Sequence, residues 1–314
     1  MSGTVFITGA NVGVGLATTS HFLSKGWNIV ATTRDGIPSA ALRDLQSSNP
    51  SLLHIVKLDL MDPSTVESSV SAALALFSRI DVLVNNAGYG EYGPVELISI
   101  QKAHQLFEVN FYGPLRLIKA FLPHFHTAGP SGIRTPTIVN VSSGGAHFGF
   151  PLGALYHASK AALESLTECI AFELSALSIP VATKLVIPYG GISGTNFFHA
   201  LVRMNKVFED SSGGDSAQVQ AIEDYKKFTQ DMMAKFQAMA GASMSATQVA
   251  EVVFEAATDL DTRRLRYFTG AGAEPSAALK LRYLGSLGSQ QLVTKKDFDE
   301  MDDKYVKQVR ALFE

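Results

Sequence analysis

Cysteine is almost absent from this chain of 314 residues, in which Cys169 is the only one. One thiol cannot form an intramolecular disulfide or a cysteine-based metal cluster, and such a composition suits a reducing compartment. Cys169 falls within an apolar helical pattern, which predicts a side chain packed in the core. No group of histidines and cysteines has the spacing of a zinc site, so we expect no bound metal.

An excess of charge of either sign is also lacking. The 26 lysines and arginines nearly balance the 29 aspartates and glutamates, which leaves a net charge of -3. The chain therefore has no global basic field that would capture nucleic acid or an anionic membrane, and we expect neither as a partner. Its 46% hydrophobic content is typical of a compact soluble protein with a sizeable core.

Long apolar runs are missing as well. No stretch reaches the length that a bilayer-spanning helix requires. The first residues, "MSGTVFITGA", enter a strand-like pattern without the basic region and long apolar region of a targeting segment. These features predict a cytoplasmic protein without a membrane anchor.

Short β-branched runs alternate with helical patterns along most of the chain. The predicted strands are residues 4–8, 28–33, 52–60, 80–88, 137–143, 181–188 and 265–270, and the clearest predicted helices are 15–25, 64–78, 100–125, 154–177 and 246–258. Such alternation predicts parallel strands with helices on both faces. We therefore expect a single α/β domain, residues 1–314, built on a doubly wound, Rossmann-type parallel sheet of about seven strands.

The regular alternation lapses between residues 190 and 245. This segment is too long for a structureless loop, and apolar spacing predicts helices at 197–208 and 218–239 with a flexible loop at 211–216. The second helix is rich in methionine, with Met232, Met233 and Met239. It is either a lid over an apolar substrate or an ordinary amphipathic surface helix. The tail, residues 271–314, extends either the substrate pocket or a subunit contact.

A glycine-rich turn, "TGANVGVG", follows the first predicted strand and opens the first helix. Gly9, Gly13 and Gly15 lack the β-carbons that would keep a pyrophosphate away from the backbone. The amides and dipole of a helix N-terminus favour that negative charge. The turn therefore predicts a dinucleotide site, with a tight turn without a ligand as the alternative.

The stretch "YHASK" places Tyr156 and Lys160 four residues apart, on one face of a predicted helix. A free tyrosine titrates near pH 10, so a tyrosine that exchanges its proton near neutrality needs a neighbouring cation. The spacing alone fits either a surface pair or a proton donor with its tuning charge. Asn110, which lies inside a predicted helix, is a poor residue for that position because its amide competes for backbone hydrogen bonds.

Together the motifs Thr8-Gly9-x-x-x-Gly13-x-Gly15, "NNAG" at 85–88, Asn110, Ser143, and Tyr156 with Lys160 resemble the short-chain dehydrogenase/reductase family. Ser143 also lies thirteen residues before Tyr156, as in many members. The resemblance implies a nicotinamide-dependent oxidoreductase. Ser143 would donate to a substrate carbonyl, Tyr156 would deliver the proton, and Lys160 would lower the pKa of the phenol and hold the nicotinamide ribose. Asn110 would perturb its helix and hold a water that relays protons.

The same resemblance assigns the dinucleotide-binding residues. These are Thr8, Gly9, Asn11, Gly13, Val14, Gly15, Arg34, Asp59, Leu60, Asn86, Ala87, Gly88, Tyr156, Lys160, Pro188, Gly190, Gly191, Ile192 and Thr195. The last five depart from the family pattern, because Tyr189 follows Pro188 where many members have glycine. Asp59 would contact the adenine ring, with a cap at the end of a strand as its alternative role.

The choice of dinucleotide depends on the end of the second predicted strand. Thr33 stands where NAD-dependent members carry an acidic residue, and Arg34 follows it. A guanidinium suits a 2′-phosphate, so we expect NADP(H) rather than NAD(H). Val12, where many NADP-dependent members place a second basic residue, and the neighbouring Asp35 argue the other way. Arg34 as a solvated loop charge is the alternative.

From these residues we expect an oxidoreductase. It would reduce a carbonyl group, of a ketone or an aldehyde, to an alcohol or catalyse the reverse, on a small and apolar substrate. The alternatives are an epimerase or dehydratase on the same scaffold, and a regulator that senses dinucleotide without chemistry. Of two nearby histidines, we assign His147 to the substrate pocket and His157 to a structural role. The helices on either side of the fifth strand form the usual contact of the family, so we expect a homo-oligomer, a dimer or tetramer.

Overall fold

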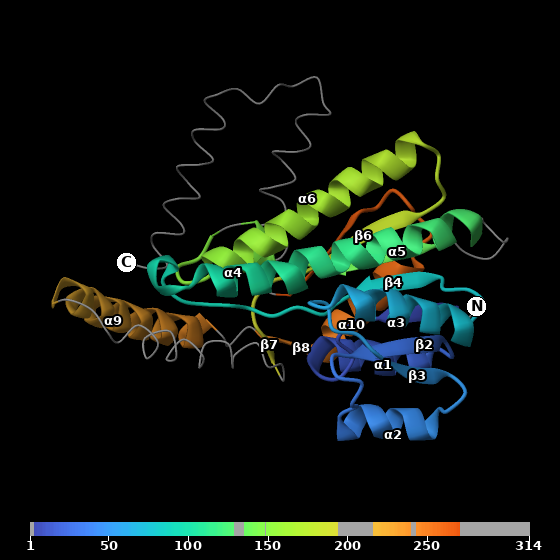
Figure 1. Cartoon of the computed structure of the whole chain (residues 1–314), viewed down its shortest axis with the longest axis horizontal. Helices are drawn as coiled ribbons and strands as arrows, with labels where there is room; N and C mark the ends of the chain where they lie inside the picture. The colour runs from blue at the N-terminus through green and yellow to red at the C-terminus, as the bar shows by residue number, and fades with distance from the viewer. Residues whose placement is uncertain (1–2, 129–134, 148, 194–215, 240–242, 271–314) are drawn as a thin grey trace.

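A computed structural model describes residues 3–128, 135–147, 149–193, 216–239 and 243–270. Its centre is a seven-stranded sheet in the order β3-β2-β1-β4-β5-β6-β9, in which every pairing is parallel (Figure 1). The strands are β1 (Thr4–Ile7), β2 (Asn28–Thr33), β3 (Leu53–Lys57), β4 (Val82–Asn85), β5 (Thr137–Val141), β6 (Ala182–Pro188) and β9 (Arg266–Thr269). The predicted Rossmann-type sheet is confirmed.

Helices cover both faces of this sheet (Figure 1). The described helices are α1 (Gly13–Ser24), α2 (Ala40–Ser48), α3 (Pro63–Leu76), α4 (Ile100–Phe107), α5 (Gly113–Ala128), α6 (Ala154–Ala176), α9 (Ser216–Met239) and α10 (Ala246–Thr258), of which α9 lies away from the sheet. Side chains alternate along each strand: Val5 joins the cluster under α1 and α10, whereas Phe6 joins the one under α3, α5 and α6. Burial on both faces explains why the strand sequences read as continuous apolar runs.

The helix predicted at 100–125 is interrupted. Between α4 and α5 the backbone widens into a π-helical turn, η2 (Glu108–Tyr112), with Asn110 at its centre. Such turns in long helices are rare and occur frequently at functional sites. The Asn110 amide explains the break, since it bonds the backbone of Tyr89 instead of facing solvent.

Two strands were not predicted. β7 (Ile192–Ser193) pairs in parallel with β8 (Met244–Ser245) in a separate two-stranded sheet. The chain therefore departs from the main fold and returns to it at neighbouring points. The predicted helix at 197–208, most of the loop at 211–216 and the tail at 271–314 lie outside the described residues.

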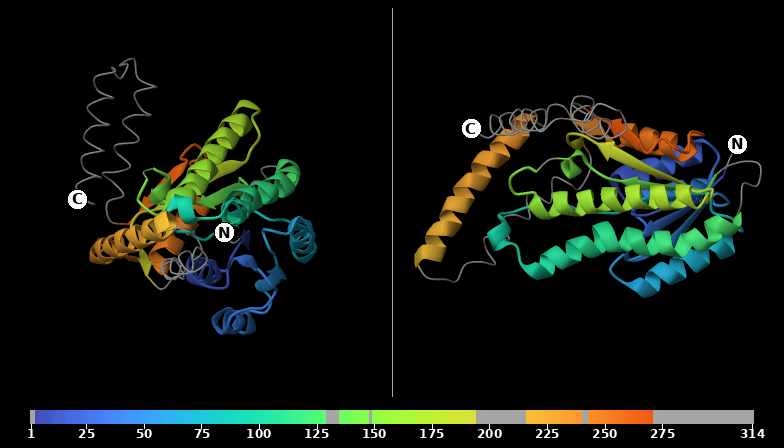
Figure 2. Two further views of the ribbon diagram at one scale, coloured as in Figure 1. Left: turned by 60° about the vertical axis from the view of Figure 1, so that its left-hand side comes forward. Right: turned by 90° about the horizontal axis from the view of Figure 1, so that it is seen from above.

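Helix α9 corresponds to the second helix predicted in this segment, at residues 218–239. It lies at the end of the molecule where α4 and α6 begin (Figure 2). The Tyr225 hydroxyl donates to the Glu96 carboxylate at 2.8 Å, which ties α9 to the short 3-10 helix η1 (Val95–Leu97). Met232 is buried, while the side chains of Met233 and Met239 lie outside the described part of the chain.

The prediction that Cys169 packs in the core is wrong, because its side chain is exposed. The buried face of α6 carries Leu163, Thr167 and Ile170. Cys169 lies two residues beyond Thr167, about 200° around the helix. Ile170, next to Cys169 in the sequence, lies on the buried face, whereas Cys169 does not. Phe172, three residues after Cys169, is exposed as well.

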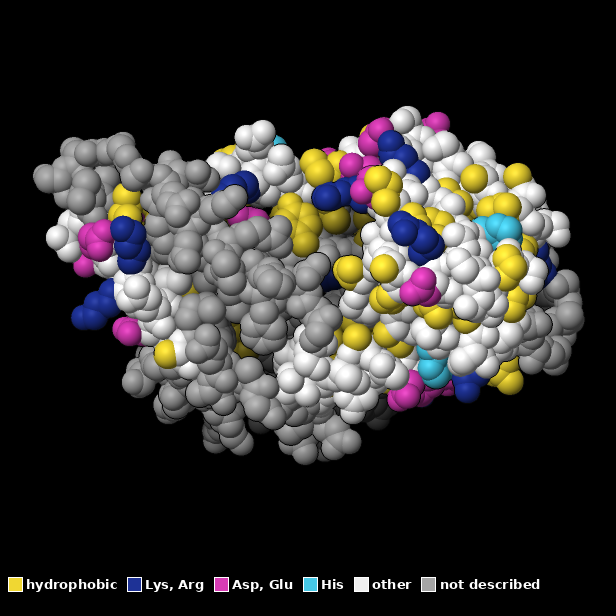
Figure 3. Space-filling model, turned by 90° about the horizontal axis from the view of Figure 1, so that it is seen from below, with side chains coloured by type: hydrophobic (Ala, Val, Ile, Leu, Met, Phe, Trp, Pro, Cys, Tyr) yellow, Lys and Arg dark blue, Asp and Glu magenta, His cyan; other side chains and the backbone are white. Residues whose placement is uncertain are grey.

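Surface charges are interspersed on the face drawn in Figure 3, where basic and acidic side chains lie among apolar ones. Among the helices that the structure describes, none combines the length and the apolarity that crossing a bilayer requires. In the same described residues, no group of three histidine, cysteine or acidic side chains is placed to hold a metal ion.

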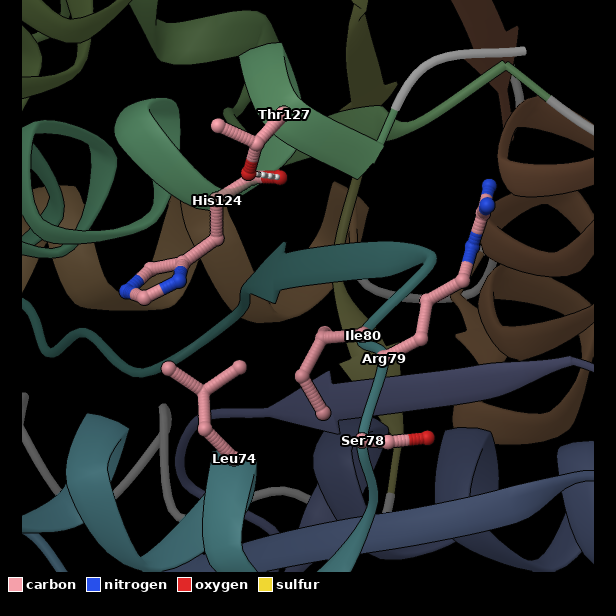
Figure 4. A pocket seen from close by; sticks show the side chains of 6 residues that line it. All are labelled: Leu74, Ser78, Arg79, Ile80, His124 and Thr127. Carbon is pink, nitrogen blue, oxygen red and sulfur yellow. Dashed lines mark hydrogen bonds between the residues drawn. The ribbon is translucent and has the colours of Figure 1, made fainter. Parts of the chain in front are cut away.

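A cavity of about 300 Å³ lies at the amino ends of the strands (Figure 4). Its lining residues are Leu74, Ser78, Arg79, Ile80, His124 and Thr127. Arg79 is held by Asp81 in an ion pair of 2.6 Å. None of the predicted site residues lines this cavity, since they follow the carboxyl ends of the strands.

Candidate active site

The glycine turn after β1 has the geometry of a phosphate cradle. Gly9 and Gly13 have φ values of 68° and 55°, a left-handed backbone that favours glycine. A β-carbon on Gly15 would press on the Gly9 carbonyl oxygen and lie 2.6 Å from the Asn86 amide nitrogen. Glycine at this position therefore lets α1 pack closely against the carboxyl ends of β1 and β4.

The N-terminus of α1 lacks a capping side chain. Its N-cap residue is Val12, which makes no side-chain hydrogen bond, and no acidic residue lies in the first turn. The first amides of a helix need a partner, and a pyrophosphate supplies one. This uncapped helix end, at the glycine turn, fits a dinucleotide; Val14 lies in its first turn.

Thr8 and Asn86 bind each other's segments. The Thr8 hydroxyl accepts the amides of Asn86 and Ala87, both at 2.9 Å, and the Asn86 side chain donates to the Thr8 carbonyl oxygen at 2.9 Å. Their side chains thus fix the turn after β1 to the turn after β4. The sequence assigned these residues to dinucleotide binding, and in the structure they shape the walls of the cradle.

Asn11 braces the loop between β2 and α2. Its side-chain amide donates to the Ile37 carbonyl oxygen at 3.1 Å, and its side-chain oxygen accepts from the Ser39 amide. Arg34 is exposed in this loop, directly after β2. Asp35 accepts the Ile37 amide at 2.9 Å, so its carboxylate caps the loop. Asn11 therefore couples the glycine turn to the segment that carries Arg34.

Asp59 and Leu60 follow β3 on the adenosine side of the predicted site. One carboxylate oxygen of Asp59 accepts the Met61 amide at 3.0 Å, which is the cap that the sequence offered as an alternative role. Leu60 is buried, and its side chain would meet a β-carbon on Gly113 at 2.8 Å. Both residues shape the edge of the sheet beside the glycine turn.

Tyr156 lies near the start of α6, and only 7% of the residue is exposed. Its phenol is hydrogen-bonded to the side chain of Ser143, the second residue after β5. Burial raises the pKa of Tyr156 to about 12, and the Ser143 hydrogen bond acts in the opposite direction. The expected lowering of this pKa is not seen in the protein alone, because loss of solvation outweighs the hydrogen bond from Ser143.

Lys160 is buried one helical turn after Tyr156, with its ammonium 6.0 Å from the centre of the tyrosine ring. The ammonium donates to the Val141 carbonyl oxygen of β5 at 2.8 Å. Burial lowers the pKa of Lys160 to about 8, while the charge of Glu164 acts to raise it. The structure therefore brings the predicted phenol, hydroxyl and ammonium together at the carboxyl end of β5.

Asn110 reaches the same place from the π-helical turn. Its amide nitrogen donates to the Tyr89 carbonyl oxygen at 2.9 Å and to the Ser159 hydroxyl at 3.0 Å. A β-carbon on Gly88 would lie 3.1 Å from the Asn110 side-chain oxygen and 3.4 Å from the Lys160 ammonium. Asn110, Gly88 and Lys160 therefore lie close together, one helical turn from Tyr156.

The end of β6 and the segment after it bring Pro188, Gly190, Gly191 and Ile192 to the same edge of the sheet. Gly190 has a φ of 81°, and the Gly191 carbonyl oxygen accepts the Met244 amide at 2.9 Å. Thr195 lies outside the described residues. Tyr189, at the position where many members have glycine, is buried against Gly144.

Comparison with known proteins places this geometry in a family. The family model described as short chain dehydrogenase matches residues 3–205. An uncharacterized oxidoreductase of Schizosaccharomyces pombe is 33% identical over 216 residues, which cover 69% of this chain and 81% of that protein. The chain belongs to the short-chain dehydrogenase/reductase family.

Solved structures of the family share the fold. A short-chain dehydrogenase from Streptomyces avermitilis is 25% identical with a TM-score of 0.68, over 91% of this chain and 94% of that one. A family member from Burkholderia phymatum, in complex with NAD, is 24% identical with a TM-score of 0.69, over 94% of this chain and 97% of that one. This short-chain dehydrogenase is an NAD(P)-dependent oxidoreductase.

Sequence reasoning left three polar residues beside the site of this short-chain dehydrogenase unassigned. Ser142, Glu164 and Tyr189 are buried and connect to His147. The spacing of Glu164 was a usable signal, because it continues the helical series of Tyr156 and Lys160 by four residues. Tyr92, whose ring centre lies 5.7 Å from that of Tyr156, gave no signal in the sequence.

His157 holds the chain between Ser143 and Tyr156. Its Nδ1 accepts the Phe150 amide at 3.1 Å, and β-carbons on Gly145 and Gly153 would each meet its ring. These contacts show a packing role for His157 within this segment of the short-chain dehydrogenase. Burial lowers the pKa of His157 to about 4, which keeps the imidazole neutral at pH 7.

Acid should therefore destabilise the folded protein through His157. The pKa in the folded state, about 4, lies below the ordinary 6.5, so the unfolded chain binds the proton more strongly. Stability from the neutral imidazole is complete above pH 6.5 and is lost as the pH falls toward 4. Urea unfolding at pH 7 and pH 5 should show a smaller loss in His157→Gln than in the wild type. Equal losses in both proteins would contradict this role.

Proposed function

We propose that this chain is an NADP(H)-dependent oxidoreductase that reduces a ketone or aldehyde to an alcohol, with Tyr156 as the general acid. The observation that carries the proposal is the grouping around Tyr156: the Ser143 hydroxyl bonds the phenol, and the Lys160 ammonium lies 6.0 Å from the ring centre. This group lies at the carboxyl edge of the sheet, where open α/β folds bind ligands.

In the proposed reaction the nicotinamide, when bound, supplies the hydride. Ser143 donates a hydrogen bond to the carbonyl oxygen and holds it beside the phenol. Tyr156 gives its proton to that oxygen as negative charge develops there. Burial raises the pKa of Tyr156 to about 12, so the phenol carries its proton near neutrality and can act as the acid.

Lys160 and Asn110 support the tyrosine in this proposal. The buried ammonium favours the phenolate that remains after the proton has left. Asn110 and Gly88 border the ammonium, and Asn110 is held there by its hydrogen bond to Ser159. Their position supports a route by which a new proton reaches Tyr156 from the side of η2.

Arg34 is the residue that we propose for NADP(H) preference. It is exposed after β2, and Asp35 is bound to the Ile37 amide rather than to the guanidinium. Replacing Arg34 by alanine should raise the KM for NADPH by about 10- to 100-fold, the cost of one or two charge-assisted hydrogen bonds. The KM for NADH should change little. Steady-state kinetics with both dinucleotides measures this, and equal effects on the two would contradict the assignment.

An apolar substrate is the class that we propose. Helix α9 lies at the carboxyl end of the sheet, and the burial of Met232 shows that this helix turns an apolar side chain inward. A nicotinamide absorbance assay with a panel of ketones, aldehydes and alcohols tests the function directly. Consumption of NADPH with at least one apolar carbonyl is the expected result, and absence of turnover with the whole panel would overturn the proposal.

A further inference from the structure

A buried group of polar and ionisable side chains lies beside Ser143 and has no part in the proposed proton transfer. It consists of Glu164, His147, Ser142 and Tyr189, which we call the Glu164 cluster. The side chains of Glu164 and His147 are each only 2% exposed. A buried carboxylate is costly unless hydrogen bonds or a nearby cation compensate its charge.

The hydrogen bonds of this cluster form a continuous chain. One carboxylate oxygen of Glu164 accepts from the Ser142 hydroxyl at 2.7 Å, and the other lies 3.0 Å from His147 Nε2. The other ring nitrogen of His147, Nδ1, contacts the Tyr189 hydroxyl. A neutral imidazole with its proton on Nε2 satisfies every contact: it donates to the carboxylate and accepts from the phenol. Glu164 is then the anion.

Both carboxylate oxygens hold the segment that carries Ser143. Ser142 precedes Ser143 directly, and His147 ends the short helix η3 (Gly144–Ala146) that follows it. The Ser143 side chain in turn accepts the Gly145 amide at 3.1 Å. Glu164 is thus bonded on both sides of the hydroxyl that contacts Tyr156.

The charge of Glu164 also reaches Lys160. Tyr156, Lys160 and Glu164 recur every four residues on the buried face of α6. Around the Lys160 ammonium, α6 contributes Tyr156 and Glu164, β5 contributes the Val141 carbonyl oxygen, and Gly88 and Asn110 are neutral. Among the described residues, the charged or titratable groups that interact with Glu164 include Lys160, His147, Tyr189 and Arg266. Arg266 is also paired with Glu168, whereas Lys160 is the cation beside Tyr156.

We propose that Glu164 is a positioning residue for the reduction proposed above: its charge keeps Lys160 protonated, and its two oxygens hold the segment that carries Ser143. The inference rests on the proposed function for its consequence in turnover. The effect on Lys160 stands without it, because that effect is a property of the folded protein alone. Glu164 acts through Lys160 and Ser143 and does not itself touch the reacting atoms.

The test uses Glu164→Gln, which keeps the shape and removes the charge, with Glu173→Gln as the matched control on the exposed side of α6. Protein labelled with ¹³C at lysine Cε is titrated by NMR, and Lys160 is identified by the signal lost in Lys160→Met. The Lys160 midpoint should fall by roughly one pH unit in Glu164→Gln and stay unchanged in Glu173→Gln. An unchanged midpoint in Glu164→Gln overturns the proposal.

Glu164→Asp separates the two effects, and its kcat tests the hold on the Ser143 segment even if the glutamine variant does not fold. The shorter carboxylate keeps the charge but withdraws from Ser142 and His147. Its Lys160 midpoint should stay near that of the wild type while kcat falls about 10-fold, a loss of one charge-assisted hydrogen bond. A midpoint as low as that of the amide variant would show that the charge is not the cause. A wild type without turnover would refute the proposed function and leave the titration decisive for Lys160.

Discussion

Tyr156→Phe should lower kcat for carbonyl reduction by about 10³-fold, because a general acid contributes factors of this order. The substitution removes only the hydroxyl that is bonded to Ser143. The ring keeps its packing against Tyr92, whose centre lies 5.7 Å away. Affinity for NADPH should therefore stay within about twofold of the wild type, as measured by fluorescence titration.

Tyr92→Phe is the matched control for this experiment. It removes the hydroxyl from the neighbouring ring and leaves Tyr156 intact, so kcat should change much less than in Tyr156→Phe. Retained turnover in Tyr156→Phe would show that another group supplies the proton. A loss of dinucleotide affinity equal to the loss of kcat would show instead that the hydroxyl holds the cofactor and not the substrate.

Gly15→Ala should weaken dinucleotide binding. The added β-carbon would press on the Gly9 carbonyl oxygen and lie 2.6 Å from the Asn86 side chain, so α1 has to move away from the two turns. Overpacking of this kind costs about 1–3 kcal/mol in free energy of unfolding. The displaced cradle should weaken NADPH binding by at least about tenfold.

Gly149→Ala provides the comparison, because a β-carbon there meets no atom within 4 Å. Isothermal titration with NADPH and urea unfolding should both give values close to those of the wild type. If Gly15→Ala bound NADPH normally, the close approach of α1 to the glycine turn would not be a requirement of the site. A loss of stability with unchanged affinity would assign Gly15 to packing alone.

The sheet was predictable from the sequence to within a few residues. Strand β2 and helix α10 begin and end where the sequence predicted, at 28–33 and 246–258. The reason is local: β-branched runs buried on both faces and an apolar helical period are properties of consecutive residues. The grouping of Ser143, Tyr156 and Lys160 was likewise predicted, since strand ends in a parallel sheet meet at one edge.

Features that depend on distant contacts were not predictable. The Glu164 cluster joins one residue of α6 to the residues that directly follow β5, η3 and β6, and no local pattern shows that they meet. The pKa of Tyr156 was expected to fall because a lysine is visible in the sequence, whereas the burial that raises it is not. Cys169 was misplaced because apolar residues lie on both sides of it in the chain while the buried face of α6 lies elsewhere.

The pairing of β7 with β8 bears on how the segment between them joins the fold. Since Ser193 pairs with Ser245, the chain leaves β7 and returns at β8 at one point of the structure. The glycine turn and Tyr156 belong to other parts of the chain, so the two strands define where this segment joins the sheet that carries the site.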